Sequence, residues 1–560
     1  MENIKENIGS CQQLSISITS TATDVNKKSI ERKDLTEAGR DLIEQLIERN
    51  DTMIDNFEKV LSNLQDSQRA ISNNSENIVN NKEILVSIVT RLKTVGGELS
   101  QMENEIEKLT EIVDEIKGDT NKIFSLALNA SIVSSKYSNT SGVFDILANK
   151  LNEMSNFINQ NLEIIVSVVR PITEGVQMLI KANENVLFEI GEGIKSLDEL
   201  NEVLDKQIES IKELFTRAEI SGKEIKGQKD MLSEVSQMIV HMDSDAQQAI
   251  QGSANVADLA RNLQEEVTHF LSIHNYNDDF IDRVNVTKEK ALRIWQNAEN
   301  VNNRSKNQLE FSKNCQNFNE KIIAESKQLK ETAEILHKQT GNNSKVSEDI
   351  SANLTRLTQQ LNDIEKNMKK SSRTIQKFND DYKQIDNILE FLKNILKSMH
   401  LIGMYSRIES ARDVEEFSGF MNISANITNL QKEIQNNIPV IEKNITDTHQ
   451  LIDSVNLAFK NISSDFDIIS GSSDQIISHL EDIVSVNRRT ETTSSDMLEN
   501  SSRIITFLNT LDDYLIDLTK IVEFPIEGSL QNIERGKKME NIFTDIIKDV
   551  QNMLTSSVSE

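Results

Sequence analysis

Between positions 85 and 116, every step of alternately three and four residues falls on an apolar side chain. These apolar residues are Leu85, Ile88, Leu92, Val95, Leu99, Met102, Ile106, Leu109, Val113 and Ile116. Such a repeat places a narrow apolar stripe on one side of a supercoiled helix. The same stepping returns from Ile385 to Ile402 and from Ile423 to Ile434. Both halves of the chain are therefore predicted to contain long coiled-coil helices.

The composition favours long helices in thin bundles. Only 3 of the 560 residues are proline, and aromatic residues make up 4% of the chain. Proline interrupts helices and aromatic side chains fill thick cores, so a shortage of both is typical of long, narrow helical assemblies. The formal net charge is −28. Because such a surface repels phosphate along most of its length, the charge excludes a general nucleic-acid binder.

Polar breaks divide the chain into segments. SSKYSNTSG (134–142) and ESARDVEEFSG (409–419) each predict a reversal between antiparallel helices, and SIHNYNDDFI (272–281) predicts a junction. Residues 1–40 show no sustained stripe and are predicted to be a polar, mobile tail. Residues 41–275 then form a first hairpin with its tip near 126–148, and residues 276–560 form a second with its tip near 400–424. The predicted fold is all-α, with two antiparallel coiled-coil hairpins that pair into an intramolecular four-helix bundle.

Residue patterns that carry catalysis are missing from the sequence. Cys11 and Cys315 are the only thiols and belong to no C-x-x-C pair, and no two of the seven histidines are four residues apart. We expect no enzyme activity, no metal site and no cofactor. The thiol count fits a reducing, cytoplasmic location. No uncharged apolar run reaches the length of a membrane span, so no membrane insertion is expected.

The first predicted reversal carries the sequence LALNASI (126–132), followed by Phe144 and Ala148. This spacing resembles the cytoplasmic tip of methyl-accepting chemotaxis receptors, whose consensus is L-A-L-N-A-[AS]-I-E-A-A-R-A-G-E-x-G-R-G-F-A-V-V-A. Val133 replaces the glutamate of this consensus and Lys136 replaces its arginine. The first tip therefore resembles the family tip without its charged pair.

The second predicted reversal resembles the other part of the same consensus. The matching residues are Ile408, Glu409, Ala411, Arg412, Glu415, Gly419 and Phe420. The charged pair is present here, whereas Tyr405 stands at the asparagine position and Val414 at a glycine position. The chain thus resembles two divergent tandem copies of a chemoreceptor signalling hairpin, each retaining what the other has lost.

This resemblance implies a function in signal transduction. In the family, two hairpins from two chains pair, and their tip binds a histidine kinase and a coupling protein. For this chain, the resemblance implies a cytoplasmic protein that binds or modulates such a kinase array, with other chemoreceptors as further candidate partners. A pseudo-dimeric monomer is favoured over a homodimer. The candidate partner-binding residues are Asn129, Ile132, Phe144, Ile408, Glu409, Arg412, Glu415 and Phe420.

Several of these residues have a simpler interpretation. Asn129 either hydrogen-bonds the nearby turn or contacts a partner. Glu409 and Arg412, three residues apart on a helix, form either an ordinary surface ion pair or part of a binding tip. Phe144 and Phe420 are expected to fill the core at the base of each reversal. The alternative function is an architectural coiled-coil scaffold with degenerate tips and no control of a kinase; an exported helical effector is a further rival.

Overall fold

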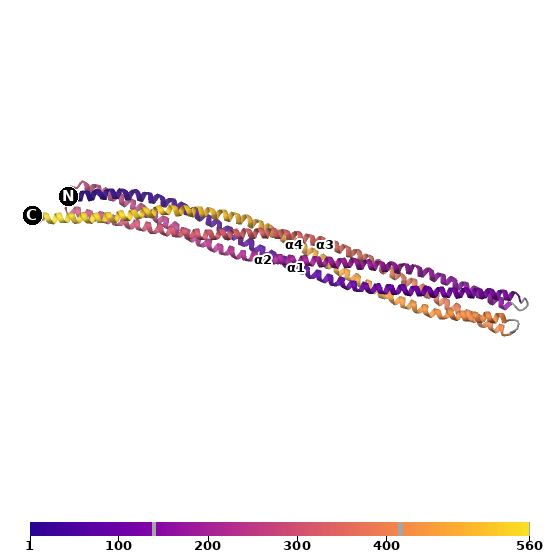
Figure 1. Ribbon diagram of the computed structural model, residues 1–560. Coiled ribbons are helices and arrows are strands. Elements are labelled where there is room, and N and C mark those ends of the chain that lie inside the picture. Colours follow the sequence, from indigo (N-terminus) through magenta and orange to yellow (C-terminus); the bar gives the residue numbers. More distant parts are fainter. Residues whose placement is uncertain (137–141, 413–417, 559–560) are drawn as a thin grey trace. The chain divides into compact units, whose positions relative to one another are not determined.

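The computed structural model describes residues 1–136, 142–412 and 418–558 of the chain. The elements are α1 (Glu2–Lys136), α2 (Gly142–Leu271), α3 (Asp278–Ser410) and α4 (Ser418–Val558). No strand occurs within these ranges. Figure 1 shows that α1 and α2 form one hairpin and that α3 and α4 form the other. The prediction of an all-α fold built from long antiparallel hairpins is confirmed.

The chain divides into two compact units, and each unit contains a segment of all four helices. Unit 1 comprises Met1–Gln68, Glu209–Lys345 and Val484–Glu560, and unit 2 comprises Arg69–Ile208 and Val346–Ile483. Each unit therefore combines helices of the first hairpin with helices of the second, as an intramolecular four-helix bundle requires. The units cut across the hairpins, and the first hairpin ends at Leu271 and the second begins at Asp278.

In unit 1, the beginning of α1 lies beside the end of α2. Ile4 and Ile8 belong to one buried cluster with Val267 and Phe270, which shows that the two helices run antiparallel. The same cluster contains Phe280, near the start of α3, whose ring meets that of Phe270 edge-on with 5.3 Å between centroids. Edge-to-face aromatic pairs of this kind add stabilisation beyond the area that they bury.

The prediction of a mobile tail over residues 1–40 is wrong, because α1 begins at Glu2. Ile4, Ile8, Cys11, Ile18 and Val25 are almost fully buried in unit 1. The buried positions of this segment follow the same alternate steps of three and four residues. Several of them carry polar side chains, so a search for apolar residues does not detect the repeat. The polar core residues are Ser15, Ser29, Arg32 and Thr36.

The buried thiols give a direct test of this correction. Burial raises the pKa of Cys11 and of Cys315 to about 12, so at pH 8 both are protonated as well as inaccessible to reagent. Because thiolate is the reactive form, we expect native protein to react with a thiol reagent at least a hundredfold more slowly than the urea-unfolded chain. Mass spectrometry of the labelled peptides distinguishes the two cysteines. Fast labelling of Cys11 alone would show that the first turns of α1 are not held in the bundle.

The two hairpins match each other at a constant offset. Phe420 follows Phe144 by 276 positions (420 − 144), and the start of α3 follows that of α1, and α4 that of α2, by the same number. The buried positions of the first hairpin largely recur in the second at this spacing: Leu109 corresponds to Ile385, and Ile158 to Ile434. The two hairpins are therefore equivalent in register, although their side chains differ widely.

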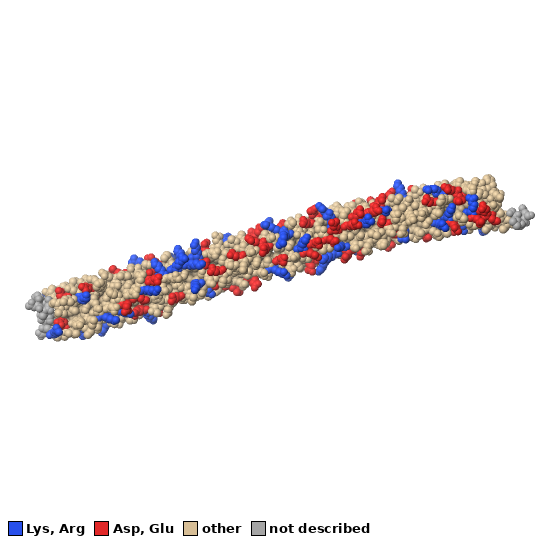
Figure 2. Space-filling view, turned by 180° about the vertical axis from the view of Figure 1, so that it is seen from behind, with Lys and Arg blue, Asp and Glu red and all other residues tan. Residues whose placement is uncertain are grey.

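The surface is polar and of mixed charge. On the face seen in Figure 2, small groups of basic and of acidic side chains alternate along the helices among wider areas of other residues. Within the described ranges, no stretch of helix is long and apolar enough to cross a membrane.

Candidate functional site at the paired tips

Four segments of unit 2 carry the candidate partner-binding residues. We call them the paired tips: residues 124–136 and 142–148 of the first hairpin, and residues 400–412 and 418–424 of the second. They comprise the end of α1 and the start of α2, together with the end of α3 and the start of α4. Figure 1 shows the end of α1 and the start of α2 at the same end of unit 2 as the end of α3 and the start of α4.

Phe144 and Phe420 join the two tips. Their rings are stacked, with centroids 3.8 Å apart and planes inclined by 24°, and each residue is only 2% exposed. The two residues are separated by the constant offset of 276 positions, so the stack joins equivalent positions of the two hairpins. The expectation that each fills the core at the base of its reversal agrees with this burial. The sequence did not indicate that they fill it together.

Small polar side chains fix the second tip locally. Ser424 donates a hydrogen bond from Oγ to the carbonyl oxygen of Gly403 (2.7 Å), which connects α4 to α3. Ser410, at the last position of α3, donates to the carbonyl oxygen of Ser406 (2.6 Å). Both serines are buried, so these bonds satisfy hydroxyl groups that would otherwise be costly to desolvate. The backbone that carries Glu409 is therefore held on two sides.

Glu409 and Arg412 form an ion pair at the end of α3. The Nη1 atom of Arg412 lies 2.9 Å from Oε2 of Glu409 and donates a hydrogen bond to Oε1 (3.0 Å). The side chain of Arg412 is 73% exposed, whereas that of Glu409 is 27% exposed. An exposed pair with this spacing contributes little to stability, about 0.2–0.5 kcal/mol. Its guanidinium remains accessible to a carboxylate from another molecule.

Asn129, Ile132 and Ile408 all lie on the surface of the paired tips. Ile132 is 49% exposed and Ile408 is 55% exposed, and they stand at equivalent positions of the two copies. Asn129 is also exposed. Ile132 and Ile408 thus place exposed apolar side chains at equivalent positions of the two hairpins, in addition to the Glu409–Arg412 pair of the second hairpin.

Other predicted residues lie apart from this arrangement. Glu415 and Val414 fall outside the described residues. In the first copy, Val133 is half-buried and Lys136 is exposed at the last position of α1, so no acid–base pair occupies these two positions. The charged pair therefore belongs to the second hairpin alone.

Sequence reasoning missed further exposed apolar residues of the paired tips. Leu128 and Met404 are equivalent residues, 55% and 47% exposed, and each lies one turn before Ile132 or Ile408. Tyr405 is 64% exposed. The signal for them was available, because apolar residues four positions apart share a helix face. What the sequence alone could not supply was which face points away from the other hairpin.

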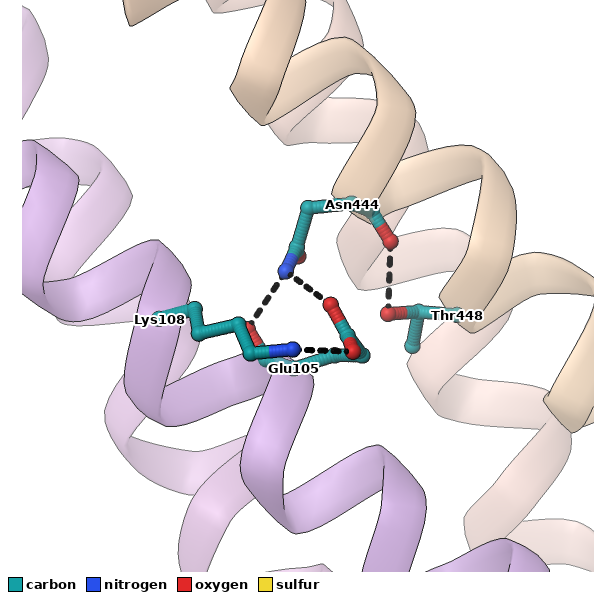
Figure 3. Close-up of polar contacts among 4 residues, drawn as sticks. All are labelled: Glu105, Lys108, Asn444 and Thr448. Atoms are coloured by element: carbon teal, nitrogen blue, oxygen red, sulfur yellow. Dashed lines mark hydrogen bonds and ion pairs between the residues drawn. The ribbon is translucent and has the colours of Figure 1, made fainter.

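A polar layer farther along unit 2 connects the two hairpins. Asn444 of α4 donates from Nδ2 to the backbone oxygen of Glu105 (2.7 Å) and to its Oε2 (2.8 Å), as Figure 3 shows. Lys108 donates to the other carboxylate oxygen of Glu105 (2.8 Å), and Thr448 donates to the carbonyl oxygen of Asn444 (2.8 Å). A buried amide that needs partners on a facing helix specifies register, so this layer helps to bring the two tips level.

No group of three or more metal-ligating side chains gathers within the part of the chain that the structure describes. The paired tips present exposed apolar side chains together with the Glu409–Arg412 ion pair. Comparison of the chain with protein-family models, with curated proteins and with solved structures finds no match.

Proposed function

We propose that this chain is a cytoplasmic, chemoreceptor-like signalling protein that binds a chemotaxis-type histidine kinase and its coupling protein at the paired tips. The observation that carries the proposal is the stack of Phe144 on Phe420. Two residues that match one consensus position meet in a single bundle, as the two tips of a receptor dimer are expected to meet. Here one chain supplies both halves.

The surface of the paired tips supports protein binding. Ile132, Ile408, Leu128 and Met404 are exposed and apolar, so a partner that covers them gains hydrophobic stabilisation. Arg412 is exposed just after the end of α3, and its planar guanidinium recognises carboxylates with defined geometry. Apolar anchors with an arginine nearby are typical of the few residues that dominate interface energy.

The asymmetry of the two copies supports a reduced number of binding sites. Between residues 126 and 148, Lys136 and Asp145 are the only charged residues, whereas the second tip carries the Glu409–Arg412 pair. A homodimer of identical hairpins presents its tip twice. A chain with one complete charged pair presents it once, so we propose a single strong site for the coupling protein.

We expect titration of purified coupling protein into the full chain, followed by isothermal calorimetry, to give one strong site per chain. Replacing both residues, E409Q/R412Q, is expected to weaken binding at least tenfold, which corresponds to about 1.4 kcal/mol. The matched gain-of-function variant is V133E/K136R, which restores the missing pair in the first copy and is expected to add a second site. Two equivalent strong sites in the unaltered chain would contradict the proposal.

The alternative, an architectural scaffold with degenerate tips, is favoured by the replacements at Val133, Lys136 and Tyr405. It makes the opposite prediction for a pull-down from the protein's own cells. A scaffold retains the same partners when Glu409 and Arg412 are neutralised, whereas a signalling tip loses the kinase and its coupling protein. Circular dichroism of E409Q/R412Q supplies the control, because an exposed pair of this kind contributes little to folding.

A further inference from the structure

One face of α2 carries exposed apolar side chains at five steps of a series that also passes through Lys150, Glu153, Glu174 and Lys181. These apolar residues are Ile146, Phe157, Ile164, Met178 and Phe188, all in unit 2, and they are between 47% and 71% exposed. We call these five residues the outer stripe. They fall on one series of positions that advances by alternate steps of three and four residues, as the core positions of the same helix do. In a supercoiled helix, such positions share one face.

The fold itself does not require this stripe. The equivalent positions of α4, at the constant offset of 276 residues, are Asn422, Glu433, Val440, Ser454 and Ser464. The equivalent helix in the same unit thus keeps the same buried register with polar side chains at four of the five places. Exposed apolar residues that gather on one face usually mark an interaction site. The difference between α2 and α4 therefore points to a binding role for the outer stripe.

The charges on α2 indicate what binds there. Glu163 is the only charged residue from 154 to 169, and this stretch is flanked by Lys150 and Glu153 before it and by Arg170 and Glu174 after it. All four flanking residues are exposed. In a second α2 running antiparallel and centred near Leu162, Lys150 of one copy faces Glu174 of the other, and Glu153 faces Arg170. A parallel arrangement would place like charges together instead.

We propose that a second copy of this chain docks antiparallel on the outer stripe of α2. Phe157 and Ile164 form the apolar centre of a contact that uses the same surface on both molecules, and the two pairs of opposite charges flank it on either side. Each chain carries a net charge of −28, so two copies repel each other over most of their surfaces. Two copies can approach each other at residues 154–169 of α2, where the surface carries little charge and the charges on either side are complementary.

Sedimentation velocity on the full chain tests the proposal. We expect a monomer–dimer equilibrium that depends on concentration, with dimer formation abolished in F157N/I164N. The matched control is Val440→Asn, because Val440 occupies in α4 the position of Ile164 in α2 and is 50% exposed. This variant is expected to dimerise as the unaltered chain does. A chain that stays monomeric up to about 100 µM, or a dimer that F157N/I164N leaves intact, would overturn the proposal.

A charge exchange tests the antiparallel register. In R170E, residue 170 of each copy meets Glu153 of the other as a like charge, so we expect dimerisation to weaken at least tenfold. In E153R/R170E, both intermolecular pairs are restored with reversed sign, while the Lys150–Glu153 ion pair within each helix (2.6 Å) is lost, so dimerisation is expected to recover part of this loss. Failure of the double variant to recover would overturn the antiparallel pairing. Residues 153 and 170 are both exposed, and the helical circular dichroism of each variant verifies that the monomers are folded.

Discussion

Replacing Phe144 by Ala is expected to destabilise the paired tips by about 3–5 kcal/mol. The ring is 98% removed from solvent and lies flat against Phe420 at 3.8 Å between centroids, so truncation leaves a cavity in contact with a second aromatic ring. The stability is lost at one end of unit 2 only, so we expect the paired tips to open locally while the rest of the chain stays folded. The rate of amide hydrogen exchange should rise several hundredfold in peptides from the C-terminal ends of α1 and α3, with little change in unit 1.

Phe391→Ala is the matched control for this experiment, because Phe391 is the same residue type in the same unit but is 45% exposed. The F391A variant is expected to change the rate of amide hydrogen exchange only slightly. The double variant F144A/F420A should cost less than the sum of the two single variants, because each removes the same stacking contact. Strict additivity, or an F144A variant whose exchange matches that of F391A, would show that the stack does not join the two tips.

Replacing Arg32 by Met is expected to stabilise unit 1 by about 1–3 kcal/mol. Arg32 is fully buried, and its hydrogen bonds go to two hydroxyl groups, Ser305 at 3.0 Å and Ser29 at 3.1 Å. Burial lowers the pKa of Arg32 to about 10, with the charge of Asp245 opposing the shift. The lowered pKa shows that burial disfavours the charged form of the guanidinium. A methionine of similar length fills the space without that cost, and the serines can turn to backbone oxygens.

Arg304→Met should have the opposite effect and serves as the control. The guanidinium of Arg304 forms an ion pair with the carboxylate of Asp245 (2.9 Å), whose side chain is only 7% exposed. Removing Arg304 therefore leaves the buried carboxylate of Asp245 with fewer partners. Trp295 is the only tryptophan and lies in unit 1, so its fluorescence during urea unfolding reports on this unit. The prediction fails if the urea midpoint of R32M lies below that of the unaltered chain. It also fails if the urea midpoint of R304M is unchanged or raised.

The sequence predicted the helices best where the core is apolar. All ten apolar steps from Leu85 to Ile116 are buried, and Ile385, Leu392 and Met399 are buried as well. It failed at residues 1–40, where Ser29, Arg32 and Thr36 take core positions. These side chains are tolerated because hydrogen bonds satisfy them, either within α1 or, for Arg32, also to Ser305 of α3. Thr36, for example, donates to the carbonyl oxygen of Arg32 (2.9 Å), and hydropathy does not reveal such a bond in advance.

The candidate site was predictable to a similar degree. Phe144 and Phe420, expected to be core residues, are buried, and Glu409 and Arg412 form the ion pair that was one of their two interpretations. Their position in one bundle depends on contacts between residues hundreds of positions apart, such as Asn444 with Glu105. No local pattern encodes those contacts. For the same reason, the sequence did not reveal that Leu128 and Met404 face away from the bundle.

The constant spacing of 276 residues limits how such a chain can change in length. A single inserted residue in one helix would rotate every later side chain by about 100° and move core residues to the surface. Lengthening without that rotation takes whole heptads, added at the same level in all four helices. Point substitutions face no such restriction, as the contrast between Phe157 and Glu433 illustrates. Insertions and deletions should therefore be confined to the reversals, the junction and the two ends, while the helices diverge in composition at fixed length.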